Sequence, residues 1–393
     1  MKKLFTFIAV ICLALNASAQ YQVANSDFEN FLSNGEPNRW HGFKSAKGNF
    51  AGMAQSSLGS SDDTRPGTTG SKSAVITSGS VIGIINNGTF TTGQLAAGSM
   101  SATNTANNAQ MDKSSTATDN NGEKFYMPLS GHPDAVKVWI KFSQGSTNAD
   151  HPFASANAVI FDGSYYQDPE NKTYTNKVAM AKNNQITVCG WTELTIPFDY
   201  DDYKDNVGVT NYNNAGGAIL VTFGTNADPG QGSKGDQVWV DDMELVYNHS
   251  LASVVYDGTN VTVASAMDLS NQIYDENKLT LAHNAKGNAQ ISKSYNTATG
   301  LLTITVYGED YGTDTETMFQ NPNSFTTYTI QFKKPYAKGD VNKDGSVTIA
   351  DVTALVNMIL GKAEKNEMAN INGDGDVTIA DVTALVNIIL GKN

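Results

Sequence analysis

Apolar and polar residues alternate in short runs from residue 20 to about residue 248. The runs AVKVWIKF, ITVCGWTELTIPF, GAILVTFGT and QVWVDDMELVY follow a period of two and are rich in β-branched and aromatic residues, which is the pattern of half-buried strands. Turn sequences such as NNG, DG and PGQG separate these runs. Because no segment before residue 350 has a convincing helical period, the pattern predicts a β-sandwich of the jelly-roll type over residues 20–248.

A second alternating region follows at residues 249–335, where LASVVYDGTNVTV, KLTLAH, GLLTITVYG and TTYTIQFKKP have the pattern of strands. Its length and strand content favour a small immunoglobulin-like β-sandwich. Within the first region, residues 100–124 form a long polar stretch. We expect an extended surface loop there.

The pattern changes to a helical period near the C-terminus, where residues 340–362 are repeated at 370–392 with 18 of 23 positions identical. Each copy has apolar residues at helical spacing and ends in Gly-Lys. In the first copy these apolar residues are Val352, Leu355, Val356, Ile359 and Leu360. The repeat predicts two helices of about ten residues each, which are marginal alone in water. Residues 336–393 are therefore expected to form a small all-α module that needs a further source of stability.

The residues before each helix have the spacing of a calcium-binding loop. Calcium prefers about six to eight oxygen ligands around a sharply turning backbone, for which glycine at loop position 6 is suited. The predicted ligands, at positions 1, 3, 5, 7, 9 and 12, are Asp340, Asn342, Asp344, Ser346, Thr348 and Asp351 in the first copy and Asn370, Asn372, Asp374, Asp376, Thr378 and Asp381 in the second. Position 7 contributes its backbone carbonyl. The alternative, an Asx-rich turn that merely precedes a helix, does not account for the full set occurring twice.

The net charge of −13 suits a protein that binds cations and argues against nucleic acid or anionic membrane as a partner. The second loop begins with Asn370 instead of Asp, so we expect it to bind calcium more weakly. Only Cys189 follows residue 19, and we expect it to be a buried, inert thiol. With no internal disulfide available after cleavage, calcium is the predicted source of stability for the two helices.

The first 19 residues have the pattern of a cleavable secretory signal, with two lysines, an apolar run from Leu4 to Leu15 and a small-residue end at Ala17, Ser18 and Ala19. No later segment approaches the roughly 20 apolar residues of a membrane-spanning helix. We therefore expect an exported protein, secreted or at the cell surface, without a transmembrane segment.

Residues 335–393 resemble a type I dockerin, because each calcium loop is followed by a helix but not preceded by one. The resemblance implies two calcium ions and a cohesin-type protein partner. It also implies that loop positions 10 and 11 contact this partner, here Ile349, Ala350, Ile379 and Ala380. Many dockerins have hydroxyl residues at these positions, and this chain does not. Two nearly identical faces lead to the hypothesis that either copy can dock.

The N-terminal region resembles the "putative carbohydrate metabolism domain" of exported bacterial proteins, through NSDFENFLSNGEPNRW, GTFTTGQLAAGS and GDQVWVDDMELVYN. The resemblance implies a β-sandwich and association with glycan or polysaccharide, but no established reaction. It also suggests one structural calcium ion in the jelly roll, held by Glu29 and Asp241, with Asp242 as a substitute. The alternative is that these acids are solvated at strand ends.

Aromatic side chains that stack on sugar rings are the candidate glycan-binding residues. In AVKVWIKF, Trp139 shares a strand face with Lys137 and Lys141, and Trp191 similarly lies among polar residues. Tyr165 and Tyr166 lie in a loop that could form a rim. The alternative is that both tryptophans pack across strands. Trp40, within PNRWHGF, is expected in the core.

The favoured function is glycan association by a protein that its dockerin tethers to a partner. One alternative is a glycoside hydrolase or other polysaccharide-degrading enzyme displayed by the same module, and another is a structural surface protein without a sugar ligand. The loop acids Asp162, Asp168, Glu170, Asp199 and Asp201 show no pairing in the sequence, and a glycosidase requires two facing carboxyl groups. The five histidines have no metal-binding spacing. No catalytic residue is assigned.

Overall fold

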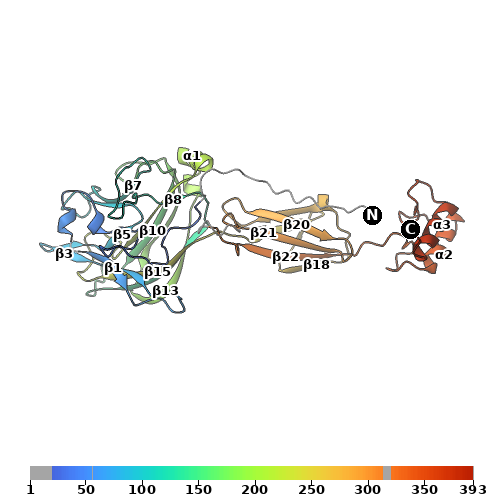
Figure 1. Ribbon diagram of the computed structural model, residues 1–393, viewed down its shortest axis with the longest axis horizontal. Helices are drawn as coiled ribbons and strands as arrows, with labels where there is room; N and C mark the ends of the chain where they lie inside the picture. The colour runs from blue at the N-terminus through green and yellow to red at the C-terminus, as the bar shows by residue number, and fades with distance from the viewer. Residues whose placement is uncertain (1–19, 55, 313–319, 393) are drawn as a thin grey trace. The chain divides into compact units, whose positions relative to one another are not determined.

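The computed structural model describes residues 20–54, 56–312 and 320–392, so the predicted signal sequence lies outside the described residues. The chain is mainly β, as its alternating pattern predicts (Figure 1). It divides into two compact units. The first comprises Met1–Ser250, His283–Gln290 and Val306–Thr326, and the second comprises Leu251–Ala282, Ile291–Thr305 and Thr327–Asn393. The boundaries expected for three domains, at residues 248/249 and 335/336, stay a prediction.

Two sheets with a shared core form the sandwich of the first unit (Figure 1). One sheet has the order β1 (Ser57–Ser61), β2 (Ser73–Thr77), β15 (Gln237–Val246), β9 (Ala135–Ser143) and β13 (Cys189–Pro197). The other has the order β12 (Lys177–Ile186), β10 (Ala154–Phe161), β14 (Gly217–Gly224) and β5 (Thr89–Thr91), with β8 (Pro128–Leu129) paired to β14. Alternation along β9 turns Val138, Ile140 and Phe142 into the core. The fully buried Trp40 confirms the expectation for that residue.

A third sheet lies in the first unit, and part of it falls in the stretch that was expected to be an extended loop. Its order is β11 (Tyr166–Asp168), β7 (Asn107–Met111) and β6 (Gln94–Ala97). β7 has the polar sequence NNAQM, which shows no apolar alternation, and pairs with β6 and β11 on its two sides. Two neighbouring ladders therefore stabilise a strand that its own sequence does not predict. A separate hairpin consists of β3 (Gly79–Val81) and β4 (Ile84–Asn86).

One α-helix before residue 350 contradicts the expectation that this region has none. α1 spans Val207–Ala215 and buries only Gly208 and Tyr212, so it has no continuous apolar stripe for a sequence pattern to reveal. Short 3₁₀ turns occur at η1 (Phe43–Ser45), η2 (Ala51–Met53) and η3 (Asp201–Tyr203). Cys189, which was expected to be buried, is only half-buried at the start of β13.

The second unit contains most of two further sheets, as expected for the small sandwich. One has the order β17 (Thr259–Val261), β16 (Leu251–Tyr256) and β19 (Leu279–His283), and the 3₁₀ turn η4 (Glu276–Lys278) precedes β19. The other has the order β18 (Ala266–Leu269), β22 (Phe325–Phe332), β21 (Leu301–Tyr307) and β20 (Gln290–Asn296). β18 pairs with β22 in parallel orientation. Alternation along β21 buries Leu302, Ile304 and Val306 completely.

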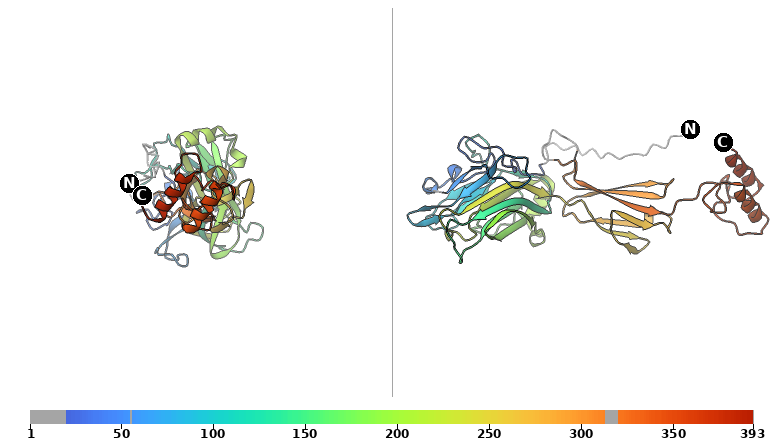
Figure 2. Two further views of the ribbon diagram at one scale, coloured as in Figure 1. Left: turned by 90° about the vertical axis from the view of Figure 1, so that its right-hand side faces the viewer. Right: turned by 90° about the horizontal axis from the view of Figure 1, so that it is seen from below.

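Two helices lie side by side at the end of the second unit, as the repeat predicts (Figures 1 and 2). They are α2 (Ile349–Ile359) and α3 (Ile379–Ile389), and their shared core contains Val341, Leu355, Met358, Ala369, Ile371 and Leu385. Leu360, which was expected on the apolar face, is instead exposed at the helix end. Among the described residues, no helix combines the length and apolar character needed to cross a membrane.

Candidate functional site

Both repeated loops turn through left-handed backbone at positions 4 and 6. Gly345 and Gly375, at position 6, have φ of +93° and +101°. A side chain in this region of φ is disfavoured, which explains the glycine in both copies. Position 4 is Gly373 with φ +78° in the second loop but Lys343 with φ +59° in the first, so the first loop adopts this conformation without glycine.

In the first loop, side-chain oxygens turn inward and bind the loop's own amides. The two oxygens of Asp340 accept hydrogen bonds from the N–H groups of Asp344 at 3.0 Å and Gly345 at 2.9 Å. Asn342 donates from its side-chain amide to Asp344 at 2.8 Å. Ligand positions 1, 3 and 5 are therefore connected by hydrogen bonds within one turn of the chain.

The residue at position 12 connects the loop to the helix. Asp351 Oδ1 accepts a hydrogen bond from the N–H of Asn342, and Asp351 Oδ2 accepts one from the N–H of Thr348. Thr348 is the N-cap of α2 and completes a capping box with Asp351. Asp381 repeats both contacts in the second copy, so each aspartate holds its loop against the helix that follows.

The donor set of the first loop fits a hard divalent cation. Asp340 and Asp351 are fully buried, as is Asp381 in the second loop. Within the described part of the chain, no lysine, arginine or histidine forms an ion pair with any of them, and the nearby Lys343 binds Glu367 instead. Buried carboxylates without a cationic partner are strongly unfavourable. Oxygen-bearing side chains at this spacing along a tight turn are the ligand type that calcium prefers.

The second loop offers fewer negatively charged side chains to a cation than the first. Asn370 replaces the first aspartate, is only half-buried, and accepts a hydrogen bond from the N–H of Gly373 at 2.9 Å. Side-chain carboxylate ligands are therefore expected only from Asp374 and Asp381, because Asp376 at position 7 contributes its backbone carbonyl, whereas the first loop has three. The neutral side chain at position 1 reduces the attraction for a cation.

The predicted partner-contacting residues lie on the surface at the start of each helix. Ile349 is 72% exposed and Ile379 is 70% exposed, and their neighbours Ala350 and Ala380 are exposed as well. Leu360 and Leu390, which follow the two helices, also expose more than half of their surface. The two copies therefore present similar exposed apolar residues at equivalent places, and their contact with a partner stays a prediction.

The sheet with the order β1, β2, β15, β9 and β13 carries three tryptophans on its outer face. Trp139 in β9 and Trp239 in β15 alternate with fully buried neighbours and are half-buried themselves. Trp191 in β13 lies on the same face, because its Nε1 donates to Asp63 Oδ1 at 2.9 Å and Asp63 also binds Lys141. The expectation that Trp139 shares a face with Lys137 and Lys141 is confirmed.

Cations cover part of this tryptophan face. The Arg65 guanidinium lies 5.4 Å from the ring centre of Trp139, and Lys141 Nζ lies 4.5 Å from that of Trp239. No such cation contact involves the ring of Trp191 among the described residues. The sequence analysis did not single out Trp239, although it alternates with Val238 and Val240 as Trp139 does with its neighbours.

The other predicted glycan- and calcium-binding residues of the first unit do not form one site. Tyr166 is fully buried, so its ring is not available to a ligand, and only Tyr165 reaches the surface. Glu29 accepts hydrogen bonds from the amides of residues 71 and 72, whereas Asp241 accepts one from the N–H of Arg65. Burial, together with neighbouring Asp242, raises the pKa of Asp241 to about 6. Glu29 and Asp241 thus bind two parts of the loop between β1 and β2. Their role in binding calcium stays a prediction.

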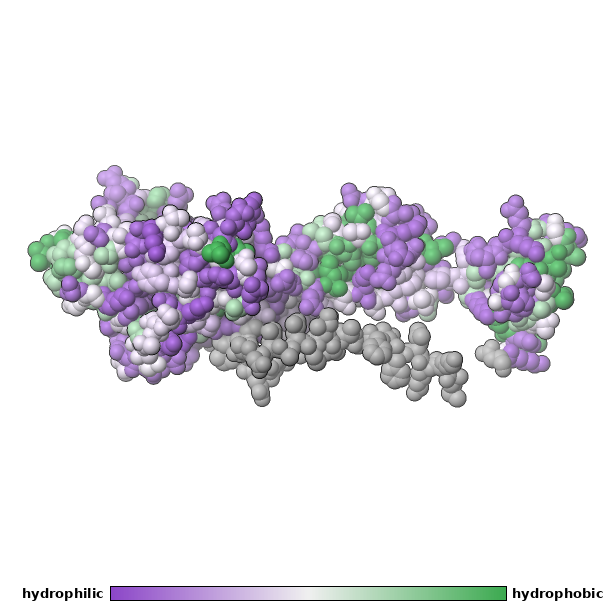
Figure 3. Space-filling model, turned by 90° about the horizontal axis from the view of Figure 1, so that it is seen from above, coloured by the Kyte–Doolittle hydropathy of each residue, from purple (hydrophilic) through white to green (hydrophobic). Residues whose placement is uncertain are grey.

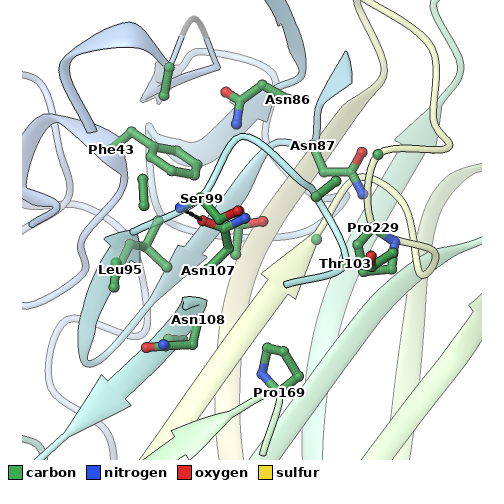
Figure 4. A pocket seen from close by; sticks show the side chains of 18 of the residues that line it. Phe43, Asn86, Asn87, Leu95, Ser99, Thr103, Asn107, Asn108, Pro169 and Pro229 are labelled. Atoms are coloured by element: carbon green, nitrogen blue, oxygen red, sulfur yellow. Dashed lines mark hydrogen bonds between the residues drawn. The ribbon is translucent and has the colours of Figure 1, made fainter. Parts of the chain in front are cut away.

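A cavity of about 370 Å³ lies beside the third sheet, and one of the candidate acids lines it (Figure 4). Burial raises the pKa of Asp168, while Lys182 opposes this effect and Glu170 adds to it. Asp168 is the only carboxylate among the described residues that line the cavity. The carboxyls of Asp162 and Asp199 are engaged elsewhere, by Asn211 and by the N–H of Asp201.

Two calcium-type loops, each followed by a capped helix on a common core, define a module of the dockerin class. The model of the dockerin type I domain matches residues 338–390, and this segment is a dockerin. Dockerins of this type bind calcium. The comparison with curated protein sequences finds no match.

Two solved structures resemble the chain at low similarity. A "putative glycoside hydrolase" from Bacteroides vulgatus is 20% identical, with a TM-score of 0.37, and the match covers 48% of this chain and 76% of that one. A second protein so described, from Bacteroides thetaiotaomicron, is 15% identical, with a TM-score of 0.40 and coverage of 60% and 73%. Values this low establish neither a shared fold nor a shared activity.

Proposed function

We propose that the chain is an exported modular protein that associates with glycan through its N-terminal β-sandwich and docks to a cohesin-type partner through residues 336–393. One observation supports the proposal that docking depends on calcium. Asp340, Asp351 and Asp381 are buried in loops that contain no cationic partner for them among the described residues. Calcium, when bound, supplies the positive charge that these carboxylates lack.

Two ions are proposed, one in each loop, because each loop has the complete ligand spacing. The carboxylates orient the loop, and the loop in turn holds the exposed Ile349 and Ile379 at the helix starts. Helices of 11 residues are marginal without tertiary support. Calcium binding should therefore be coupled to folding of the docking surfaces.

Capture of purified cohesin domains by the immobilised full chain tests the docking proposal. Binding is expected in calcium and should be lost in excess EGTA. The double variant Asp344→Ala/Asp374→Ala should lose binding in calcium. The matched control is Asp376→Ala, because position 7 contributes a carbonyl that this substitution keeps. Equal capture with calcium and with EGTA would rule out calcium-dependent docking.

The tryptophan face supports the glycan proposal. On this outer face of the sheet that contains β9, β13 and β15, Trp139, Trp191 and Trp239 lie among charged residues. Half-exposed indole rings can cover the apolar faces of sugar rings. Trp191→Ala should weaken retention in gels that contain the bound polysaccharide, whereas Val188→Ala, an exposed apolar residue before the same strand, should not. Unchanged retention of Trp191→Ala would exclude this face as the binding surface.

Glycoside hydrolysis is the alternative function. The carboxylates that line the cavity help to distinguish it from glycan binding. Most glycosidases use two facing carboxyl groups. Asp168 has no second carboxylate among the described cavity residues, which favours binding over hydrolysis. Release of reducing ends from a polysaccharide that the protein binds, and its loss in Asp168→Asn, would support the hydrolase instead. A structural surface protein would show neither binding nor release.

A further inference from the structure

The loop between β1 and β2 reaches across the tryptophan face. It comprises residues 62–72, and β1 lies at one edge of the sheet with β2 beside it. Asp63, two residues after the end of β1, accepts a hydrogen bond at 2.9 Å from Nε1 of Trp191, which belongs to β13 at the opposite edge. Arg65 lies over Trp139 of β9, between the two edges. The loop therefore covers part of the face on which the three tryptophans lie.

Cations that this loop supplies or holds occupy two of the three indole rings. The Arg65 guanidinium lies 5.4 Å from the ring centre of Trp139. Lys141 Nζ lies 4.5 Å from the ring centre of Trp239 and 2.5 Å from Asp63 Oδ2, so a loop carboxylate fixes the second cation. A cation over an indole occupies the π face on which a sugar ring would stack. Stacking of a ligand on either ring therefore requires the cation to move.

A β-bulge in β15 positions the carboxylate that holds the Arg65 side chain. The register between β15 and β9 shifts between Asp241 and Glu244, and Asp242 within this bulge has a φ of +40°. Bulges re-aim side chains, and a positive φ is uncommon for residues other than glycine. Asp242 Oδ2 binds Arg65 Nε at 2.5 Å. The irregular backbone of β15 therefore places a negative charge where it keeps the guanidinium on the tryptophan face.

The backbone of the loop is held at two places, whereas the guanidinium has contacts that solvent can replace. Asp241 accepts a hydrogen bond from the N–H of Arg65, and Glu29 accepts those of residues 71 and 72. The guanidinium itself has one ion pair, one ring contact and the carbonyl of the next residue, and 23% of the side chain is exposed. Exposed ion pairs and cation–π contacts each contribute little stability. A ligand can therefore displace the guanidinium while the loop stays in place.

The tryptophan face differs in character from the apolar end of the same unit. Figure 3 shows hydrophobic residues gathered at the end of the first unit where Figure 1 places β3, and Ile82 and Ile84 of the β3–β4 hairpin are exposed. On the tryptophan face, charged side chains flank the rings instead, as where Lys137 pairs with Glu244 at 2.6 Å on the same side of the sheet as Trp139. Aromatic rings beside hydrogen-bonding groups suit a polyhydroxylated ligand better than an apolar surface does.

We propose that Arg65 and Lys141 occupy, in the free protein, the positions at which glycan stacks on Trp139 and Trp239, and that glycan displaces them. The inference rests on the proposed association with glycan and identifies the residues that limit affinity at that site. Each cation lowers the apparent affinity of the ring that it covers, because only the uncovered ring is competent to bind. Removal of a cation should therefore strengthen binding, whereas removal of the ring beneath it should weaken binding.

Two measurements on the full chain test the proposal, and the first needs no glycan. Acrylamide quenching of tryptophan fluorescence reports how accessible the indole rings are, and Trp40 contributes little because it is fully buried. Arg65→Ala and Lys141→Ala should each increase the quenching constant. The second measurement is retention in gels that contain mixed-linkage β-glucan, glucomannan, xylan or pectin. Each variant should increase the affinity for the retained polysaccharide by about two- to fivefold, which is the factor that one exposed cation–π contact accounts for.

Two further variants separate this effect from a general change in the sheet. Trp139→Ala should decrease retention, so that two residues in direct contact, Arg65 and Trp139, have opposite effects. A merely structural role of Arg65 would change retention in the same direction as the loss of Trp139. The matched control is Lys72→Ala, because Lys72 lies in the same loop and pairs with Asp62 but covers no indole ring among the described residues. It should change neither the quenching constant nor retention.

Each outcome decides a different point. Stronger quenching and stronger retention in Arg65→Ala and Lys141→Ala, with the Lys72→Ala control unchanged and all melting temperatures similar, support the proposal. If one variant is unfolded, the other decides. Unchanged quenching in both variants shows that the cations do not cover the rings and overturns the proposal. Weaker retention in both overturns it as well, because the cations then belong to the binding surface. No retention of any variant overturns the association with glycan, while quenching alone still decides whether the cations cover the rings.

Discussion

The carboxylate of Asp351 accepts a hydrogen bond at 3.0 Å from the backbone N–H of Asn342, nine positions earlier in the chain. Asp381 and Asn372 repeat this contact at the same distance. The aspartate that completes each helix's capping box therefore also closes the loop before it. Any cation held by the loop is expected to stabilise the helix through this one side chain.

Removal of calcium should melt α2 and α3 while leaving the β-sheets folded. Without a cation the buried Asp340 and Asp351 repel each other, and the small core cannot compensate. Hydrogen exchange of the full chain with calcium and after addition of EGTA measures this, because protection at residues 349–359 and 379–389 should fall. The strand amides of β9 and β15 are the internal control. Identical protection of the helices in both conditions would contradict calcium-coupled folding.

The two loops should bind calcium unequally. The first has three carboxylates that bind through their side chains and the second has two, so the second site is expected to be about tenfold weaker. Calorimetric titration of the full chain should resolve two steps. Asn370→Asp should bring the weaker step toward the stronger one, and Asp340→Asn should weaken the stronger step. Two equal sites in the unaltered chain would be inconsistent with this account.

Each repeat should unfold when its own ligand set is broken. Asp344→Ala removes a carboxylate that organises the first loop, and Asp374→Ala does the same in the second. We expect loss of one calcium equivalent and loss of exchange protection mainly in the adjacent helix for each variant. Unchanged protection of both helices in both variants would show that the loops do not stabilise them.

The calcium loops were predictable because their ligands lie within 12 residues of each other, so spacing alone carries the information. The tryptophan face was partly predictable for the same reason, since alternation along AVKVWIKF places Trp139 outward. α1 was missed because it buries only Gly208 and Tyr212 and so has no continuous apolar stripe. The cavity was not predictable, because its residues range from Phe43 to Gly230 and meet only through the sheet topology.

The docking surfaces should be redundant. Ile349 and Ile379 occupy equivalent exposed positions in the two copies. If either copy can dock, Ile349→Asp/Ala350→Asp should leave cohesin affinity nearly unchanged, as should the same change at Ile379 and Ala380. The fourfold variant should lose binding by at least about a hundredfold, as expected when every apolar anchor is removed. A large loss from either double variant, with calcium binding intact, would show that a single face is used.

The pKa of His132 should be set by Glu309, which lies in the same unit. His132 Nδ1 is 3.2 Å from Glu309 Oε1, and its Nε2 is 2.9 Å from Asn213 Oδ1. Burial lowers the pKa of His132, but the hydrogen bond and charge of Glu309 outweigh burial and raise it above the ordinary value. Conversely, the contacts with His132 outweigh burial and lower the pKa of Glu309.

Because the histidine has a raised pKa in the folded state, its stabilising contribution is complete below about pH 6.5 and is lost as pH rises through the folded-state pKa. The melting temperature of the first unit should therefore fall between pH 6 and pH 8.5 more in the unaltered chain than in His132→Gln. This difference isolates His132 from His41, His151, His249 and His283, which are present in both proteins. In Glu309→Gln, where the carboxylate is absent, NMR titration should place the His132 pKa lower than in the unaltered chain. A His132 pKa at or below 6.5 in the unaltered chain would contradict the pairing.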